Sequence, residues 1–317
     1  MNCLISRIFS ARVQRDPFPY FVVDDALDRY LVEEAVKRWP DKRFFGEGDV
    51  YGRRTLSLPD TLDMLPKEDK LFWKFLVDEI CSMVVYGAVT SFAPFLQRKF
   101  KGPNSLRYDS VGLTEIDDEA SEFYLTPHCH FWTNPVYVFT ILLYLGAQED
   151  TNGTTLYGVE GGLYTEDGRS RLAELASRSY EYETHAAKVP ADLLPQRRVE
   201  FRPNRLLCVL DSAASFHGVE LWRRSAGSPS GTRQRKLLRF HIAAPSETCS
   251  EVFGLPLESF QRVARSVEER PLFERLCARD IETIAAVDVA PTPGAADIDY
   301  ANRFEIEPMV IIPASAP

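Results

Sequence analysis

Six short β-rich runs lie between Ser105 and Ala244, and they constrain the fold more than any other feature of the chain. Each run is rich in β-branched and aromatic residues, and Gly, Asn, Asp or Pro separates it from the next. Many short strands with this punctuation are typical of a sandwich or barrel. The runs are SLRYDSVGL, EFYLTPHCHFW, VYVFTILLYLG, GTTLYGV, RLLCVLD and KLLRFHIAA.

The segment before these runs predicts one strand and two helices. The apolar run over 17–25 indicates a strand, and a helical pattern opens at Asp28 and continues to residue 39. A second helix is predicted over 67–86, after a proline and with an acidic first turn. Its apolar residues at helical spacing are Leu71, Phe75, Ile80 and Val84.

The remaining segments are less regular. Residues 1–15 favour an N-terminal strand or arm over an organelle transit peptide, because a long Ser/Arg-rich amphipathic stretch is missing. Residues 167–179 indicate a short surface helix or loop, and the composition of 225–231 (SAGSPSG) indicates a mobile hairpin tip that can close over a site. Residues 256–286 predict a helix kinked or broken at Pro271, followed by a late strand, FEIEPMVII.

No repeat and no long linker divides the chain, so a single domain is expected. Its parts are supporting elements over 17–100, a β core over 105–244 and a helical and irregular extension over 255–317. The 45% hydrophobic content of the 317 residues is enough for a large core.

Charge and cysteine usage narrow the class of protein. The net charge of −9 gives no positive field for a phosphate backbone, so nucleic-acid binding is not expected. The longest apolar run, residues 136–147, is too short to cross a bilayer, so no membrane span is expected. The six cysteines lie far apart and form no CxxC pair, which indicates reduced thiols in the cytoplasm.

Two of the five histidines form the motif His128-Cys129-His130 in an extended stretch. Residues i and i+2 of a strand project from the same face, so both imidazoles are expected to point at one spot. His217, in SFHGV after another strand, is a candidate third ligand that only tertiary folding can bring to this pair. Three facial imidazoles suit iron, zinc, copper or nickel and leave positions open for water, oxygen or a chelating substrate.

Three segments resemble, in order, those of the prolyl-hydroxylase-like Fe(II)/2-oxoglutarate-dependent dioxygenases. They are PFPYFVVDDAL, the block TPHCHFWTNPVYVFTILLYLGAQEDTNGTTLYG, and FRPNRLLCVLDSAASFHGVELW with the later RQRKLLRFHIAA. The similarity is loose over 17–40 and good over 105–244. It implies a distorted double-stranded β-helix, a cupin-like jelly roll that is mainly β with flanking helices.

The resemblance also implies roles for individual residues. His128 matches the first iron ligand and His217 the distal one. Tyr144, sixteen residues after His128, matches a tyrosine that often helps to hold 2-oxoglutarate. Arg235 matches the arginine that grips the distal carboxylate of 2-oxoglutarate, although Arg233 and Arg239 lie on the same alternating face of the expected strand and are alternatives.

The sequence departs from the family at two positions. His130 stands where the family has Asp or Glu, and Leu237 stands where a small hydroxyl or aliphatic residue usually follows the arginine. An imidazole at 130 leaves the Fe(II) site one positive charge higher, which should weaken metal affinity and improve the charge balance against a dianionic cosubstrate. The same imidazole fills the slot that chloride occupies in halogenating relatives, so halogenation is disfavoured.

Other residues near these motifs can be explained by a structural role as well as by a functional one. Asp211 and Ser215 flank the distal ligand, and a turn former is favoured over an orienting role for Asp211. His185 is expected in solvent and His241 in the core or substrate pocket. Sheet packing and pocket lining are equally compatible with the residues after the motif, and a solvated hairpin explains most of the basic cluster. These two sets are Phe131, Trp132 and Asn134, and Arg223, Arg224, Arg233, Arg235, Lys236 and Arg239.

The resemblance implies an enzyme that uses Fe(II), 2-oxoglutarate and molecular oxygen to oxidise a C–H bond of a small molecule, amino acid or carrier-bound substrate. Two alternatives stay open from the residues alone. One is a three-histidine metalloenzyme that does not use 2-oxoglutarate, and the other is a non-catalytic binding protein on the same fold.

Overall fold

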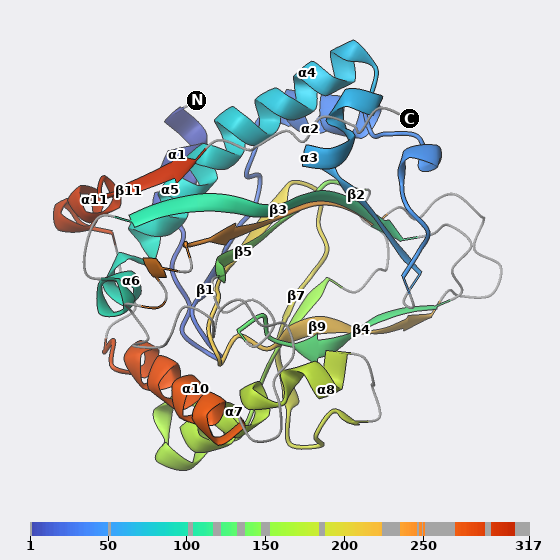
Figure 1. Ribbon diagram of the computed structural model, residues 1–317. Helices are drawn as coiled ribbons and strands as arrows, with labels where there is room; N and C mark the ends of the chain where they lie inside the picture. The colour runs from blue at the N-terminus through green and yellow to red at the C-terminus, as the bar shows by residue number, and fades with distance from the viewer. Residues whose placement is uncertain are drawn as a thin grey trace.

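A computed structural model describes residues 2–49, 52–100, 104–116, 122–131, 137–146, 153–183, 188–223, 235–245, 247, 248, 250, 270–288 and 293–307. Two sheets face each other in its centre, with helices outside them (Figure 1). Among the described strands, every pair is antiparallel except β11 with β3. The predicted core of antiparallel sheets with flanking helices is confirmed, and the jelly-roll path itself stays a prediction.

The large sheet has seven strands in the order β1-β8-β5-β10-β3-β11, with β2 paired to β3 beside this path. The small sheet has the order β4-β9-β6-β7. The strand bounds are β1 Tyr20–Val23, β2 Arg53–Ser57, β3 Asn104–Ile116, β4 Glu122–His128, β5 Tyr137–Tyr144, β6 Thr154–Gly158, β7 Leu194–Val199, β8 Arg205–Leu210, β9 His217–Arg223, β10 Lys236–Ala243 and β11 Phe304–Glu307.

The six β-rich runs correspond to β3, β4, β5, β6, β8 and β10, so these predicted strands are confirmed. Three strands carry no such signal. Strand β7 (LPQRRV) is an edge strand with five exposed residues, and an edge needs no apolar alternation. Strands β2 and β9 mix charged and apolar residues and begin next to the site described below.

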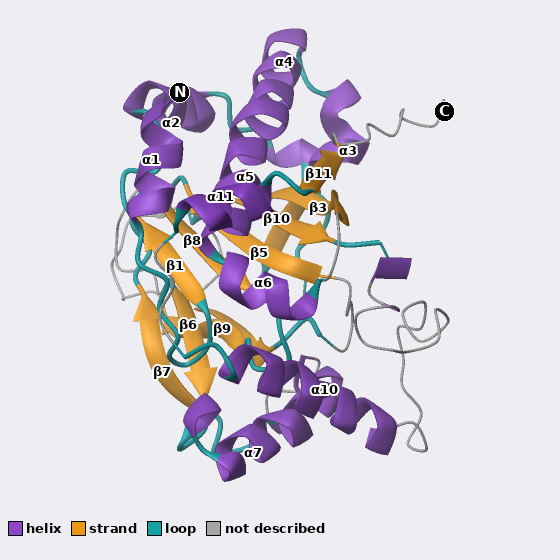
Figure 2. Cartoon of the chain, turned by 90° about the vertical axis from the view of Figure 1, so that its left-hand side faces the viewer, coloured by secondary structure: helices purple, strands orange, loops and turns teal. Residues whose placement is uncertain are grey.

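The helices cover the outside of both sheets, and Figure 2 places α10 and α7 far from α4. The helix bounds are α1 Asn2–Ser10, α2 Arg29–Lys37, α3 Leu58–Thr61, α4 Lys67–Phe75, α5 Ser82–Ser91, α6 Ala93–Lys99, α7 Glu166–Ser177, α8 Ser179–Glu183, α10 Arg270–Ala285 and α11 Ala295–Ala301. Short 3-10 turns span Lys42–Phe44, Leu62–Met64 and Gly162–Tyr164. No single described helix has both the length and the apolarity to cross a membrane, while α4–α5 and α6 satisfy both only as a pair bent by 78°.

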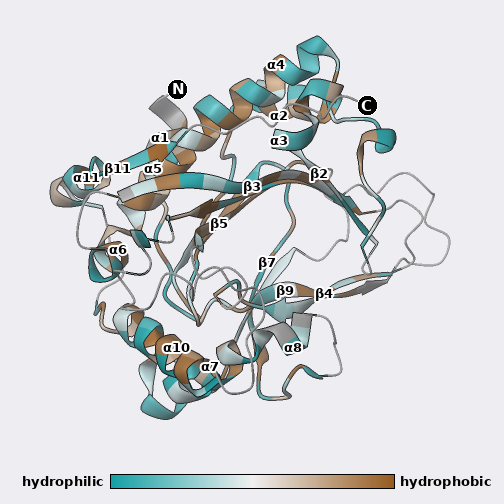
Figure 3. Cartoon of the chain, viewed as in Figure 1, coloured by the Kyte–Doolittle hydropathy of each residue, from teal (hydrophilic) through white to brown (hydrophobic). Residues whose placement is uncertain are grey.

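The helix predicted over 67–86 begins at Lys67 as expected and continues to Ser91. A π-helical segment, Leu76–Cys81, interrupts it and shifts the phase of the buried face. Consequently Leu71 and Phe75 of the predicted stripe are exposed, whereas Ile80 and Val84 are buried as expected. Figure 3 shows the outer part of α4 as largely hydrophilic.

The N-terminal prediction was wrong, because Asn2–Ser10 forms a helix instead of a strand or arm. Leu4 and Ile8 are buried where α1 packs against α5, so tertiary contacts stabilise a segment without a strong local signal. At the other end, Arg270–Ala285 is helical with Pro271 in its first turn, where the missing N–H breaks no helical bond. The expected mobile tip over 225–231 lies outside the described residues.

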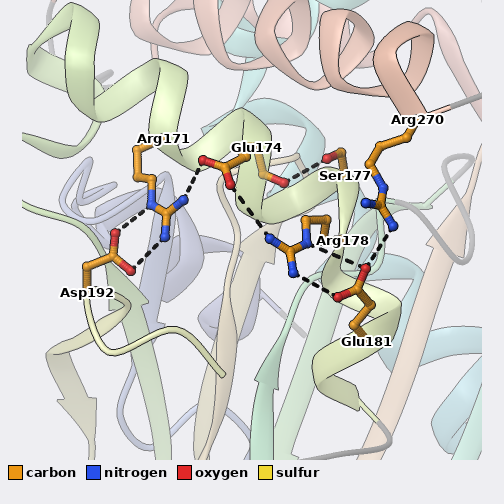
Figure 4. A network of polar contacts seen from close by, with 7 residues as sticks. All are labelled: Arg171, Glu174, Ser177, Arg178, Glu181, Asp192 and Arg270. Atoms are coloured by element: carbon orange, nitrogen blue, oxygen red, sulfur yellow. Dashed lines mark hydrogen bonds and ion pairs between the residues drawn. The ribbon is translucent and has the colours of Figure 1, made fainter. Parts of the chain in front are cut away.

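Helices α7, α8 and α10 are joined by a network of ion pairs (Figure 4). Glu181 of α8 accepts from Arg178 at 3.0 Å and from Arg270 of α10 at 2.9 Å. Arg171 of α7 pairs with Asp192 and Glu174. Because several charges share partners, the network fixes these helices relative to one another better than isolated surface pairs do.

Strands β4 and β9 approach closely where the histidine motif lies. His128 is paired with His217 in the β4–β9 register, and Gly218 follows at once. A Cβ placed on Gly218 would lie 2.5 Å from the Leu125 carbonyl oxygen, which is backbone and cannot rotate away.

Replacing Gly218 with alanine should therefore force β9 away from β4. We expect Gly218→Ala to lower the free energy of unfolding by about 1–3 kcal/mol, the usual cost of overpacking, in a urea titration. Gly46→Ala is the control, because a Cβ there meets nothing within 4 Å. Equal effects of the two substitutions would contradict this account.

Candidate metal centre and pocket

His128, His130 and His217 lie together between the two sheets. One nitrogen from each can be chosen so that all three lie within 4.8 Å of one another. The ring centroids of His128 and His217 are 4.7 Å apart, and that of His130 is 5.2 Å from the first and 4.8 Å from the second. The structure thus brings together the three histidines that the sequence singled out.

A separate acceptor holds the Nδ1 atom of each imidazole. His128 Nδ1 donates to the Thr126 carbonyl oxygen at 2.8 Å, and His217 Nδ1 donates to the Ser215 carbonyl oxygen at 2.9 Å. His130 Nδ1 donates to Asp211 Oδ1 at 3.2 Å. In this tautomer every Nε2 is left with a lone pair for a metal ion, and such orientation is typical of metal-binding histidines.

Asp211 orients His130, which differs from the prediction. The sequence favoured a turn former, and the orienting role considered for it was toward His217. In the structure Thr140 Oγ1 donates to Asp211 Oδ2 at 2.7 Å and lies 3.0 Å from His130 Nδ1, so the three side chains form a closed triangle. Thr140 was missed, although a lone hydroxyl in the buried run VYVFTILLY is a signal that can be recognised.

Burial keeps the imidazoles of His128 and His217 in the neutral form that binds metal. The pKa of His217 is lowered to about 4, mainly because burial penalises the charged ring and also because His130 is close. Burial likewise holds the pKa of His128 well below its usual value, and the neighbouring His217 and His130 add to this effect. No proton therefore has to leave these two ligands at neutral pH before a cation binds.

A buried ion pair supports the loop that carries two of these anchors. Lys99 Nζ of α6 lies 2.6 Å from Asp280 Oδ1 of α10 and donates to the Asp211 carbonyl oxygen at 3.2 Å. Asp280 Oδ2 accepts from the Ala213 N–H at 2.9 Å. Both charged side chains are buried, with exposures of 6% and 1%. The loop 211–216 is therefore fixed by two helices from distant parts of the sequence.

The histidines form one end of a pocket of about 610 Å³ between the sheets, including its open mouth. The wall of the pocket contains three arginines, Arg53, Arg235 and Arg239, and no Asp or Glu among the described residues. The other lining residues are mostly apolar or hydroxyl-bearing: Thr114, Ile116, Phe123, Leu125, Thr140, Leu142, Thr154, Gly218, Val219 and Leu237, with His241 beside the three histidines. The field in the pocket therefore favours an anion.

Arg235 lines the pocket, whereas Tyr144 does not line it and reaches it only through a hydrogen bond to the lining residue Thr154. Arg235 immediately precedes β10 and is 5% exposed, with its guanidinium carbon 5.4 Å from the centroid of Phe123 and 5.8 Å from that of Phe201. Tyr144 is fully buried, stacks on Phe201 at 4.8 Å and shares a 2.7 Å hydrogen bond with the Thr154 hydroxyl. Burial lowers the pKa of Arg235 to about 10, so a bound anion would relieve a real electrostatic cost.

The remaining candidates have different positions. Arg239 lines the pocket on the face predicted by strand alternation, and His241 faces the pocket as expected. Phe131 is buried and stacks on Phe273 of α10 at 6.0 Å, which supports the packing interpretation. Lys236 lies over the Trp39 ring at 5.3 Å. Five other candidates lie outside the described residues: His185, Trp132, Asn134, Arg224 and Arg233. The side chain of Arg223 is not described either.

Neither the known family models nor the curated proteins gave a match to the chain. Solved structures with similarity are a prolyl hydroxylase from Trichoplax adhaerens in complex with a hypoxia inducible factor peptide fragment and HygX from Streptomyces hygroscopicus with nickel and 2-oxoglutarate bound. The first has 11% identity, a TM-score of 0.44 and coverage of 79% of this chain and 91% of its own. The second has 15% identity, a TM-score of 0.42 and coverage of 72% and 84%.

An oxidoreductase of the 2OG-Fe(II) oxygenase family from Burkholderia pseudomallei has 11% identity and a TM-score of 0.40, and the match covers 71% of this chain and 84% of that protein.

Loss of the carboxylate at Asp211 should weaken metal binding. Asp211→Asn keeps the size of the side chain but removes the charged acceptor of His130 Nδ1, and removal of such a partner typically lowers metal affinity 10- to 100-fold. Isothermal titration of Ni²⁺ into the metal-free protein measures this change. Asp192→Asn, which breaks a pair with Arg171 between two partly exposed side chains, is the matched control. Unchanged Ni²⁺ affinity in Asp211→Asn would show that His130 is held without the carboxylate.

Proposed function

We propose that this protein is an Fe(II)- and 2-oxoglutarate-dependent oxygenase that oxidises an unactivated C–H bond of a small molecule, an amino acid or a carrier-bound substrate. One observation carries the proposal: three buried imidazoles, each held through Nδ1, converge at one end of a pocket whose wall also contains a buried arginine. A metal and a dianionic cosubstrate are the two groups that this combination suits best.

In this proposal His128, His130 and His217 hold Fe(II). Three neutral imidazoles leave the full charge of the cation uncompensated, but the Asp211 carboxylate lies one hydrogen bond behind His130 and returns a negative charge to the site. The residues present therefore fit a divalent ion. Bound Fe(II) and 2-oxoglutarate together supply the activation of molecular oxygen on which the oxidation depends.

Arg235 is assigned to the distal carboxylate of 2-oxoglutarate, with Tyr144 in support. The guanidinium is buried beside the rings of Phe123 and Phe201 and lines the pocket. The stack of Tyr144 on Phe201 and its bond to Thr154 hold this end of the pocket rigid. A charge-assisted pair formed in such a dry site is strong.

The substrate is expected against the apolar wall of the pocket. Ile116 of the large sheet packs there against Phe123 and Val219 of the small sheet, with Leu125 beside them. This cluster keeps water from the oxidising centre and offers a surface for hydrocarbon.

We further propose that the chain is one oxygenase domain, because a single core cluster extends from Leu4 to Ala301. A reducing compartment such as the cytoplasm is part of the proposal, since Cys81 and Cys208 are buried thiols outside any disulfide. Three-histidine chemistry without 2-oxoglutarate is the alternative that the all-imidazole donor set favours.

Substitutions at position 130 test the metal site. His130→Ala should lose metal and turnover, whereas His130→Asp should keep the metal because it restores the usual charge. The new carboxylate would lie near Asp211, so the double variant His130→Asp/Asp211→Asn should bind more tightly than His130→Asp alone. Fe(II) content after anaerobic loading, with succinate formation as the second readout, measures these effects. Normal metal content in His130→Ala would remove His130 from the ligand set.

Arg235→Ala tests the cosubstrate assignment. Loss of the charge-assisted pair should weaken 2-oxoglutarate binding by about 2–5 kcal/mol, or roughly 30-fold to several thousand-fold, while iron content stays near normal. Anaerobic titration of 2-oxoglutarate into the Fe(II) protein, followed by the visible charge-transfer band of the chelate, gives the constant. Arg202→Ala is the control, since Arg202 pairs with Glu200 at the surface.

No band in the unaltered protein would discard 2-oxoglutarate and favour the alternative. A band with an unchanged constant in Arg235→Ala would move the anchoring role to Arg239 or Arg233.

A further inference from the structure

A fourth histidine in the pocket has no partner. His241 of β10 is 5% exposed, and neither of its ring nitrogens has a hydrogen-bond partner in the described structure. Its ring centroid lies 4.7 Å from that of His130 and 4.6 Å from that of Tyr137. Buried polar groups are almost always paired, so an imidazole with two free nitrogens facing a pocket indicates that a ligand supplies the missing partner.

Arg239 lies two residues earlier on the same face of β10 and also lines the pocket. Its Nε atom is enclosed and has no partner among the described residues. Burial, together with the neighbouring Arg53, lowers the pKa of Arg239 to about 10. Arg53 itself is paired with Asp49 at 2.8 Å, whereas Arg239 forms no ion pair among the described residues and feels the Asp49 charge only at longer range.

Arg239 and Arg235 occupy different parts of the pocket. They are four residues apart on an extended chain, which separates their Cα atoms by about 13 Å at roughly 3.3 Å per residue. Arg235 lies among Phe123, Phe201 and the Tyr144 end of β5. Arg239 pairs in register with Leu142, between that end and the His241–Thr140 pair beside the metal centre. If Arg235 takes the distal carboxylate of the cosubstrate, a second anion is needed for Arg239.

We propose that Arg239 and His241 form a second oxyanion subsite, which binds a carboxylate or phosphate group of the substrate next to the metal centre. This inference rests on the proposed function and deepens it, because it makes the substrate an organic acid or phosphate ester and not a neutral molecule. Arg239 supplies the charge, and His241 donates one hydrogen bond from a neutral ring. The apolar wall then receives the hydrocarbon part of the same molecule.

The test uses the full chain loaded with Ni²⁺ in the presence of saturating 2-oxoglutarate. The Ni²⁺-loaded protein is chosen because it is not expected to turn over. The probes are N-acetyl amino acids with their neutral amides, and sugar phosphates with the parent sugars, each at 10 mM in a thermal unfolding assay. We expect acids of one of the two series to raise Tm and their neutral counterparts to leave it unchanged. The series that responds identifies the group as a carboxylate or a phosphate.

Arg239→Met should weaken binding of the responding acid at least 30-fold, and His241→Phe about 10-fold, while each changes the 2-oxoglutarate constant less than threefold. Arg235→Ala should show the reverse pattern. Equal responses to acids and neutral counterparts, or no response to any probe, would overturn the subsite. The subsite would also be rejected if Arg239→Met weakened the binding of 2-oxoglutarate as strongly as Arg235→Ala does, because Arg239 would then bind the cosubstrate.

The same titrations are repeated with Ni²⁺ alone. Acid binding that depends on Arg239 in a protein that fails to bind 2-oxoglutarate would reject the proposed function and keep the subsite. Binding of 2-oxoglutarate without acid selectivity would reject the subsite and keep the function.

Discussion

The contact between Asp211 and His130 is the interaction on which the site depends. Without a carboxylate at position 130, a triad of imidazoles has no negative charge of its own, and the ring at 130 needs a hydrogen-bond partner that fixes its orientation. Asp211 supplies both the negative charge and the hydrogen-bond acceptor, with its Oδ1 atom 3.2 Å from His130 Nδ1. Thr140 Oγ1 completes the triangle by donating to Asp211 Oδ2. Because the triangle is buried, each of its bonds is stronger than it would be in water.

The rest of the structure serves to keep that triangle in place. Asp211 directly follows strand β8 of the large sheet, whereas His128 and His217 belong to the small sheet, so the distance between the sheets fixes the geometry. The backbone of the loop 211–216 is held by Lys99 and Asp280, and the same loop presents the Ser215 carbonyl to His217. The spacing of the sheets and the position of the loop 211–216 therefore both determine where the three imidazole rings lie.

Strand alternation was enough to predict that His128 and His130 share a face and that Arg235 and Arg239 share another, because the period of two is a local property. The partner of His130 was not predictable in this way. Asp211 is 81 residues distant, and its role depends on the pairing of β5 with β8. The helix α1 and the phase shift after Phe75 were also missed, since both depend on packing against the sheet and not on local propensity.

The attachment of α10 to the loop 211–216 bears on how the protein matures during synthesis. Every proposed ligand has left the ribosome by residue 217, yet Asp280 follows more than sixty residues later. Until it emerges, Lys99 has no carboxylate to pair with and the Ala213 N–H has no acceptor. At roughly 5–20 residues per second, the nascent chain spends seconds with its histidines synthesised but their loop unsupported. If the proposed metal binds, its stable uptake is expected only after the C-terminal helix has been synthesised.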